Sequence, residues 1–213
     1  MNGQDINKAL IDTLKSPELN DLTVNLGEVA LDQIMSEGIL KDLPIFGSLQ
    51  KLYKMGLSIR DALFLKKLCN FLFSMSAVSN EDRIRLLEKM KSDAKSKYEV
   101  GEKILMLLER ADDFLKPIII AETFKAYMRD KINYDQLQRI SYGIDHLYIR
   151  DLKDFKKSYI NASSILEESA KQNLRLCGFV ILSMRMDGRH EVEEITNLGE
   201  LLLHEVLEKI DNL

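Results

Sequence analysis

The most apolar stretch of the chain runs from residue 43 to residue 78, and its pattern predicts two consecutive α-helices. Ser58 and Asp61, near its middle, have the spacing of a capping box, in which each side chain accepts a hydrogen bond from the backbone N–H of the other residue. We expect central helices over residues 44–55 and 58–75. Apolar side chains would cover an arc of roughly 200° around the second helix, more than one ordinary surface helix needs.

Apolar residues recur at helical spacing through most of the remaining chain as well. Residues that interrupt helices are scarce, with three Pro and ten Gly among 213 residues. The pattern predicts further helices over residues 4–15, 19–35, 79–91, 98–108, 111–128, 134–147, 152–159 and 164–176. Ser79 with Asp82, and Ser164 with Glu167, have capping-box spacing at the start of two of them.

One segment near the C-terminus has a different character. The apolar run Phe179–Leu182 and the segment His190–Ile195 have the composition of strands, and Asp187-Gly188 between them is a strong turn signal. Thr196 then stands where it can cap a final helix. The sequence therefore predicts a single β-hairpin between two helices.

These patterns together predict a mostly α fold. We expect a multi-helix bundle over residues 1–133, built on the two central helices, and a small C-terminal module over residues 134–213 that contains the β-hairpin. The composition, 46% hydrophobic and 30% charged, is ordinary for a soluble globular protein. A chain of this length can bury a core without disulfides or metals.

No residue pattern typical of an enzyme or a cofactor site stands out. His146, His190 and His204 lie on separate segments, and none forms a metal-binding motif such as H-E-x-x-H. A Gly-rich phosphate loop and a nucleophile elbow are also absent from the sequence. Cys69 and Cys177 lie within apolar runs, which is typical of core residues in a reducing compartment. With no signal-peptide pattern at the start, we expect a cytoplasmic, non-enzymatic protein without cofactor or metal.

Two short motifs near the C-terminus resemble the winged-helix superfamily. They are Gly178-Phe179-Val180 and Ile195-Thr196-Asn197-Leu198-Gly199-Glu200-Leu201-Leu202. In that superfamily such motifs flank a wing hairpin that follows a recognition helix. The resemblance implies a winged-helix-like module within residues 134–213, and a capped hairpin unrelated to the superfamily is the alternative. In overall layout, the rest of the chain resembles small helical bacterial proteins linked to phage defence, which implies a role in bacterial or phage defence or regulation.

The winged-helix resemblance also implies which residues would meet nucleic acid, because the helix before the wing enters the major groove. These residues are Lys171, Gln172 and Arg175 on the helix, and Arg185 and Arg189 on the wing. However, Glu167 and Glu168 stand near the leading end of that helix, and residues 134–213 hold ten Lys/Arg against fourteen Asp/Glu. Binding to phosphates requires an excess of cations, so a DNA-binding regulator is our second hypothesis.

Basic residues line the central apolar segment. Residues 41–75 carry six Lys/Arg and two Asp, whereas residues 1–40 carry two Lys against seven acids. Our first hypothesis is a non-enzymatic protein-interaction module in which this basic rim binds a protein partner or a second copy of the chain. The candidate residues are Lys51, Lys54, Arg60, Lys66 and Lys67. A third hypothesis is a membrane-acting effector that releases the amphipathic segment 43–78 onto an anionic membrane surface.

Overall fold

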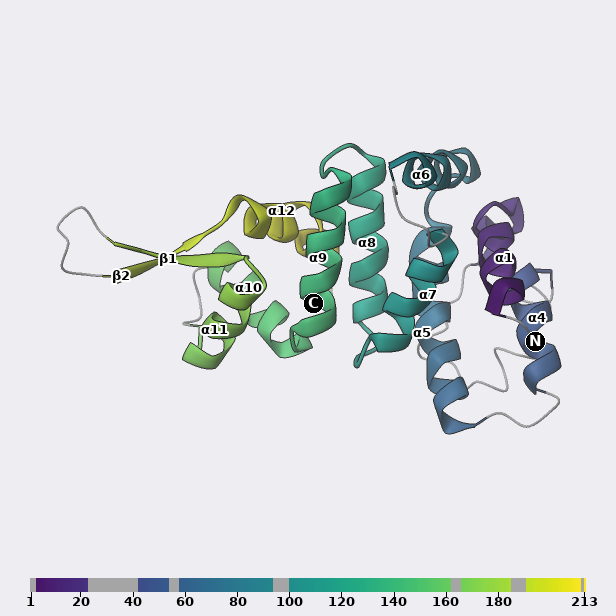
Figure 1. The fold of residues 1–213 in the computed structure, drawn as a ribbon, viewed down its shortest axis with the longest axis horizontal. Helices are drawn as coiled ribbons and strands as arrows, with labels where there is room; N and C mark the ends of the chain where they lie inside the picture. The colour runs from purple at the N-terminus through teal and green to yellow at the C-terminus, as the bar shows by residue number, and fades with distance from the viewer. Residues whose placement is uncertain are drawn as a thin grey trace. The chain divides into compact units, whose positions relative to one another are not determined.

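The computed structural model describes residues 3–22, 42–53, 58–93, 100–161, 166–184, 191–211 and 213 (Figure 1). Within these ranges the chain is mostly α-helical with one two-stranded antiparallel sheet, so the predicted fold class is confirmed. The contacts divide the chain into two compact units, residues 1–121 and 122–213. This division falls inside a helix, whereas the sequence suggested a boundary after residue 133.

The first unit is built from helices alone in its described part. They are α1 (Gly3–Leu14), the 3-10 helix η1 (Pro17–Asp21), α4 (Pro44–Tyr53), α5 (Ile59–Ser76), α6 (Asn80–Asp93), α7 (Val100–Arg110) and the first part of α8 (Lys116–Met128). Helix α1 contacts α4 and α7, and α5 contacts α7 and η1. Leucine and isoleucine side chains from several of these helices are fully buried and form the core of the unit.

The two predicted central helices are confirmed as α4 and α5. The predicted capping box is present, because the Ser58 hydroxyl accepts from the Asp61 N–H at 3.2 Å and the Asp61 carboxylate accepts from the Ser58 N–H at 3.1 Å. The buried face of α5 consists of Leu65, Leu68, Cys69, Phe71, Leu72 and Met75. Ile59 and Leu63 instead face solvent, so the apolar arc of α5 is wider than the face that the fold covers.

Two predicted helices of this unit have different bounds in the structure. The helix expected from residue 111 begins at Lys116, because the Asp113 carboxylate accepts from the Leu115 N–H at 2.7 Å and holds a turn ahead of the helix. At the start of the helix expected over residues 19–35, the structure has the 3-10 helix η1. Residues 23–41 lie outside the described part of the chain, so the rest of this prediction is not tested.

The second unit contains the hairpin. After the end of α8 come α9 (Tyr134–His146), α10 (Ile149–Asn161), α11 (Glu168–Leu176), β1 (Val180–Met184), β2 (Glu191–Ile195), α12 (Asn197–Glu205) and the 3-10 helix η2 (Leu207–Lys209). The strands pair antiparallel, with Val180 opposite Ile195. The start of α11 corrects one prediction, because Glu167 is its N-cap and not the third residue of a capping box. Ser164, the other residue of that box, is not among the described residues.

A buried arginine joins the helices of the first unit. Arg83, on α6, is fully buried. Its Nε donates to the Leu14 carbonyl at 2.8 Å, one Nη donates to the Ser16 carbonyl at 2.8 Å, and the other donates to the Val78 carbonyl. Leu14 ends α1 and Val78 follows α5. Carbonyls at helix C-terminal ends have no partner in their own helix and carry the negative end of the helix dipole, so they can hold a buried cation.

Two asparagines complete this arrangement, which we call the Arg83 clasp. The Asn20 side chain accepts from Arg83 at 3.0 Å and donates to the carbonyls of Ser76 and Val78 at 2.8 and 2.9 Å. The Asn80 side chain donates to the Lys15 carbonyl. Burial lowers the pKa of the Arg83 guanidinium, but an arginine starts so high that it stays charged. The clasp therefore joins the end of α1, η1, the end of α5 and the start of α6 around one positive charge.

Replacing this charge is expected to be costly. Arg83→Met should lower the free energy of unfolding of the first unit by about 3–5 kcal/mol, because it removes charged hydrogen bonds to three carbonyls and to the side-chain oxygen of Asn20. Urea denaturation followed by circular dichroism measures the change. Arg85→Met is the matched control on the same helix, since the Arg85 side chain is 76% exposed, and it should cost less than about 0.5 kcal/mol. Equal effects of the two substitutions would contradict the clasp.

Candidate functional site

The second unit is organised around Phe179, at the entry to β1. Its side chain is fully buried against α9, where a Cβ on Gly143 would stand 2.3 Å from the ring. A Cβ on Gly199, in α12, would stand 2.2 Å from the Phe179 carbonyl oxygen. Both positions therefore require glycine for space. Gly178, with φ of +77°, requires it for backbone conformation where the chain turns from α11 into the strand.

Thr196 fixes the start of α12 to the same point. Its hydroxyl accepts from the Gly199 N–H at 3.0 Å, which confirms the predicted N-cap. The same hydroxyl donates to the Gly178 carbonyl at 2.7 Å, and the Thr196 N–H donates to the Phe179 carbonyl at 3.0 Å. These contacts are the physical reason for the spacing of the glycine and threonine motifs, because they hold both ends of the hairpin against α9.

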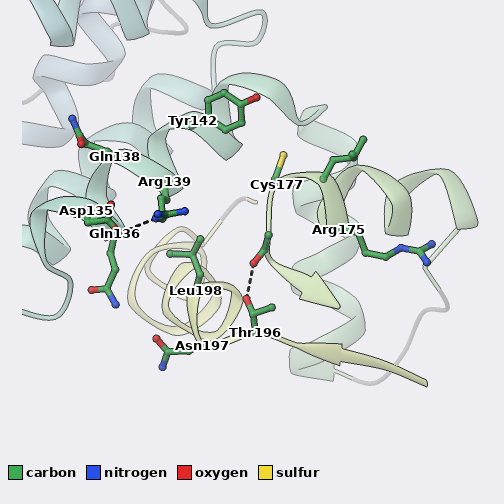
Figure 2. A pocket seen from close by; sticks show the side chains of 12 residues that line it. Asp135, Gln136, Gln138, Arg139, Tyr142, Arg175, Cys177, Thr196, Asn197 and Leu198 are labelled. Atoms are coloured by element: carbon green, nitrogen blue, oxygen red, sulfur yellow. Dashed lines mark hydrogen bonds and ion pairs between the residues drawn. The ribbon is translucent and has the colours of Figure 1, made fainter. Parts of the chain in front are cut away.

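A groove opens beside this junction, within the second unit (Figure 2). It encloses about 740 Å³. One wall is α9, the end of α11 forms another, and the first turn of α12 closes a third side. The lining residues are Asp135, Gln136, Gln138, Arg139, Tyr142, Arg175, Leu176, Cys177, Gly178, Thr196, Asn197 and Leu198.

The groove combines apolar and polar surface. Tyr142 and Leu176 border the groove and are 56% and 83% exposed, so they present apolar surface to a ligand. Arg139 directs its Nε to the Asp135 carboxylate at 2.7 Å, which leaves the two terminal amino groups of the guanidinium for a further acceptor. The first turn of α12 contributes backbone N–H groups and the positive end of its dipole. The groove can therefore accept an apolar side chain next to a carboxylate.

The cations of α11 are engaged inside the unit. Lys171 lies 3.1 Å from the Glu193 carboxylate and 3.5 Å from that of Glu168, and Arg175 pairs with Glu168 and lies 3.7 Å from Glu193. Hydrogen bonding to Glu193 raises the pKa of Lys171, and hydrogen bonding to Arg175 lowers the pKa of Glu168. Both shifts favour the charged forms, so two carboxylates balance the two cations.

These pairs bear on the residues that the sequence suggested for nucleic acid. Lys171 and Arg175 are brought together on one face of α11, but that face meets Glu193 of the hairpin. Gln172 is exposed on the same helix. Arg185 and Arg189 lie outside the described residues.

The residues suggested for the basic rim are only partly brought together. Arg60 pairs with the Glu109 carboxylate of α7, and Lys67 donates to the Glu109 carbonyl at 3.2 Å. Burial lowers the pKa of Lys67, and Lys66 is half-buried. Lys51 lies on α4, but the structure does not describe its side chain. Lys54 is not among the described residues.

The described histidines and Cys69 have structural surroundings. In the part of the chain that the structure describes, no three His, Cys, Asp or Glu side chains are placed to hold a metal ion. His146 stacks on Tyr142, His204 pairs with Glu208 at 2.8 Å, and His190 is not described. Burial raises the pKa of the Cys69 thiol to about 12, which makes it a core residue and a poor nucleophile.

No single helix among the described residues is long and apolar enough to cross a membrane. Only α5 and α6 taken together reach the required length and apolarity, and these two helices meet at an angle of 114°.

The sequence did not identify the groove. Its walls come from three helices that are distant in the chain, and Tyr142 and Leu176 sit in ordinary amphipathic patterns that do not reveal their exposure. The one available signal was the pair of glycine and threonine motifs, which mark the junction at the base of the groove. No protein family, curated protein or solved structure matches this chain.

The two crowded glycines provide a stability test of the junction. Gly143→Ala and Gly199→Ala should each destabilise the second unit by about 1–3 kcal/mol, because the added methyl overlaps Phe179. Gly47→Ala is the matched control, since nothing lies within 4 Å of its Cβ position in α4, and it should stabilise the chain by up to about 1 kcal/mol. Urea titrations of the three variants measure the differences, and wild-type stability of the Gly143 and Gly199 variants would disprove the packing.

The ion pairs of α11 provide an electrostatic test. The wild-type chain should bind a fluorescent DNA duplex no tighter than about 10⁻⁴ M near physiological salt, whereas Glu168→Gln with Glu193→Gln should bind at least about tenfold tighter, because Lys171 and Arg175 are released. Fluorescence anisotropy measures both. Glu194→Gln with Glu200→Gln makes the same change in net charge on exposed residues and should leave binding at the wild-type level. Micromolar binding by the wild type would mean that the cations are already available.

Proposed function

We propose that this protein is a non-enzymatic, helical protein-recognition module. In this proposal the groove of the second unit holds a short acidic segment of a partner protein, with an apolar side chain of that segment packed between Tyr142 and Leu176. The observation that carries the proposal is the exposure of these two large side chains in a concave site. Exposed apolar surface with a polar rim is typical of interaction sites.

The preference for an acidic segment rests on charge. The charged side chains that line the groove are Asp135, Arg139 and Arg175, and Arg175 is already paired with Glu168, so the preference depends on Arg139 and on the start of α12. Arg139 keeps donors for a second carboxylate, and α12 begins at the groove with its positive end. Polar side chains such as Asn197 and Gln138 can bind the main chain of an extended segment.

The DNA-binding alternative has weaker support. It rests on the resemblance to the winged-helix superfamily and on the order of helix, hairpin and helix, which fits that resemblance. Against it stands the pairing of Lys171 and Arg175 with Glu168 and Glu193, because these cations would have to leave their carboxylates before they could meet phosphates. A winged-helix-like module used for protein contact accommodates both observations.

The membrane-acting alternative also has weaker support. Its segment 43–78 contributes Leu65, Leu68 and Leu72 to the core, so release of α5 would expose a fully buried face to water. The cellular setting that the layout of the chain suggests is bacterial or phage defence or regulation, in the cytoplasm, and the proposed recognition does not depend on that setting.

A pair of peptide pools tests the groove. One pool of fluorescent peptides carries Leu or Phe flanked by Asp and Glu, and the other carries Lys in place of the acids. The wild-type chain should prefer the acidic pool in fluorescence anisotropy, and Tyr142→Ala should weaken that binding at least about tenfold, a loss of about 1.4 kcal/mol. Tyr148→Ala is the control, because Tyr148 is 66% exposed and does not line the groove. Equal binding of both pools, or equal effects of the two tyrosine variants, would refute the proposal.

A further inference from the structure

In the described part of the chain, strand β1 pairs with β2 and with no other strand. The sheet consists of β1 and β2, and its register places Ile181 opposite Glu194 and Leu182 opposite Glu193. Figure 1 shows the far end of this hairpin extending beyond α11 and α12 of the same unit. A strand of this kind presents a row of backbone N–H and C=O groups to whatever lies at its open edge.

The hydrogen-bond pattern shows which groups face that edge. The Thr196 N–H donates to the Phe179 carbonyl, so these two residues form a hydrogen-bonded pair at the start of the ladder. Hydrogen-bonded pairs alternate along an antiparallel ladder, so Ile181 and Ser183 also direct their backbone groups to β2. The backbone groups of Leu182 therefore point away from β2. Among the described residues, no hydrogen bond outside the hairpin uses them.

The side chains of β1 are also uncovered. Ile181 and Leu182 are 48% and 47% exposed, and successive residues of a strand lie on opposite faces of the sheet. The hairpin therefore exposes an apolar side chain on each face next to an open edge. An uncharged edge with apolar flanks is the arrangement that accepts another strand.

Charge distinguishes the two edges of the hairpin. Strand β2 carries Glu191, Glu193 and Glu194, whereas no residue of β1 is charged. A second copy that paired along β2 would bring like charges together, which is destabilising. A second copy that paired along β1 would place uncharged apolar strands side by side and leave the glutamates of both copies at the outer edges.

We propose that two copies of this chain associate through antiparallel pairing of their β1 strands. The product is a four-stranded sheet in the order β2, β1, β1, β2, with a two-fold axis that sets Leu182 opposite Leu182 of the second copy. Such a contact is self-complementary, as a two-fold interface requires. The interface is small, so the dimer is weak and depends on concentration. This inference does not rest on the groove, because β1 contributes no lining residue to it.

Sedimentation equilibrium of the full chain over about 1–100 µM tests the association. The wild type should change from monomer toward dimer across this range. Leu182→Lys, which places a charge at the centre of the pairing, should raise the dimer dissociation constant at least about tenfold. Ile59→Lys is the matched control on the first unit, where Ile59 is 83% exposed, and it should dimerise as the wild type does. A wild type that stays monomeric throughout, or equal effects of the two lysines, would overturn the proposal.

A cross-linking measurement covers the case in which the lysine variant fails to fold. Leu182→Cys in a Cys177→Ser background should form a disulfide-linked dimer on mild oxidation, because directly opposed residues of a hydrogen-bonded antiparallel pair have Cα atoms about 5.5 Å apart, within disulfide range. Ile59→Cys in the same background should remain monomeric on a non-reducing gel. Absence of the Leu182→Cys dimer, or equal dimer in both variants, would exclude the pairing.

Discussion

The helices of the first unit meet around the buried positive charge of Arg83. The guanidinium of Arg83 is held by the carbonyls of Leu14, Ser16 and Val78 and by the side chain of Asn20. Removing a charge from water is costly unless its hydrogen-bonding capacity is met, and helix C-terminal ends are among the few sources of several unpaired acceptors at one place. The positions of three helix ends are therefore set together, and the apolar core of the unit packs within that constraint.

In the second unit, carboxylate side chains balance the positive charges of α11. Phe179 brings the hairpin against α9, and the hairpin register then turns Glu193 toward α11, where Lys171 and Arg175 receive it. The positive charge of α11 is therefore used to hold the hairpin. The ligand that we propose for the groove beside Tyr142 is therefore a protein segment and not a phosphate backbone.

Much of the fold could be predicted because its signals are local. Helical spacing, capping residues and one turn dipeptide were enough for the helices and the hairpin. The sequence did contain a signal for the burial of Arg83. This residue stands three, four and seven residues before Leu86, Leu87 and Met90, so it lies on the apolar face that α6 buries. The pairing of Glu193 with Lys171 and Arg175 could not be predicted, because it depends on the register of the strands. The groove could not be predicted either, because helices that are distant in the sequence form it. Boundaries such as the start of α8 were missed where a side chain competes with the helix for backbone N–H groups.

Native-state hydrogen exchange of the wild-type chain tests the Arg83 clasp most directly, because it reports which segments open together. If one buried charge joins them, the backbone amides of residues 18–22, of the last turn of α5 and of the first half of α6 should exchange with one common opening free energy. If residues 18–22 exchange orders of magnitude faster than α6, the two segments open independently and the clasp does not hold this unit together.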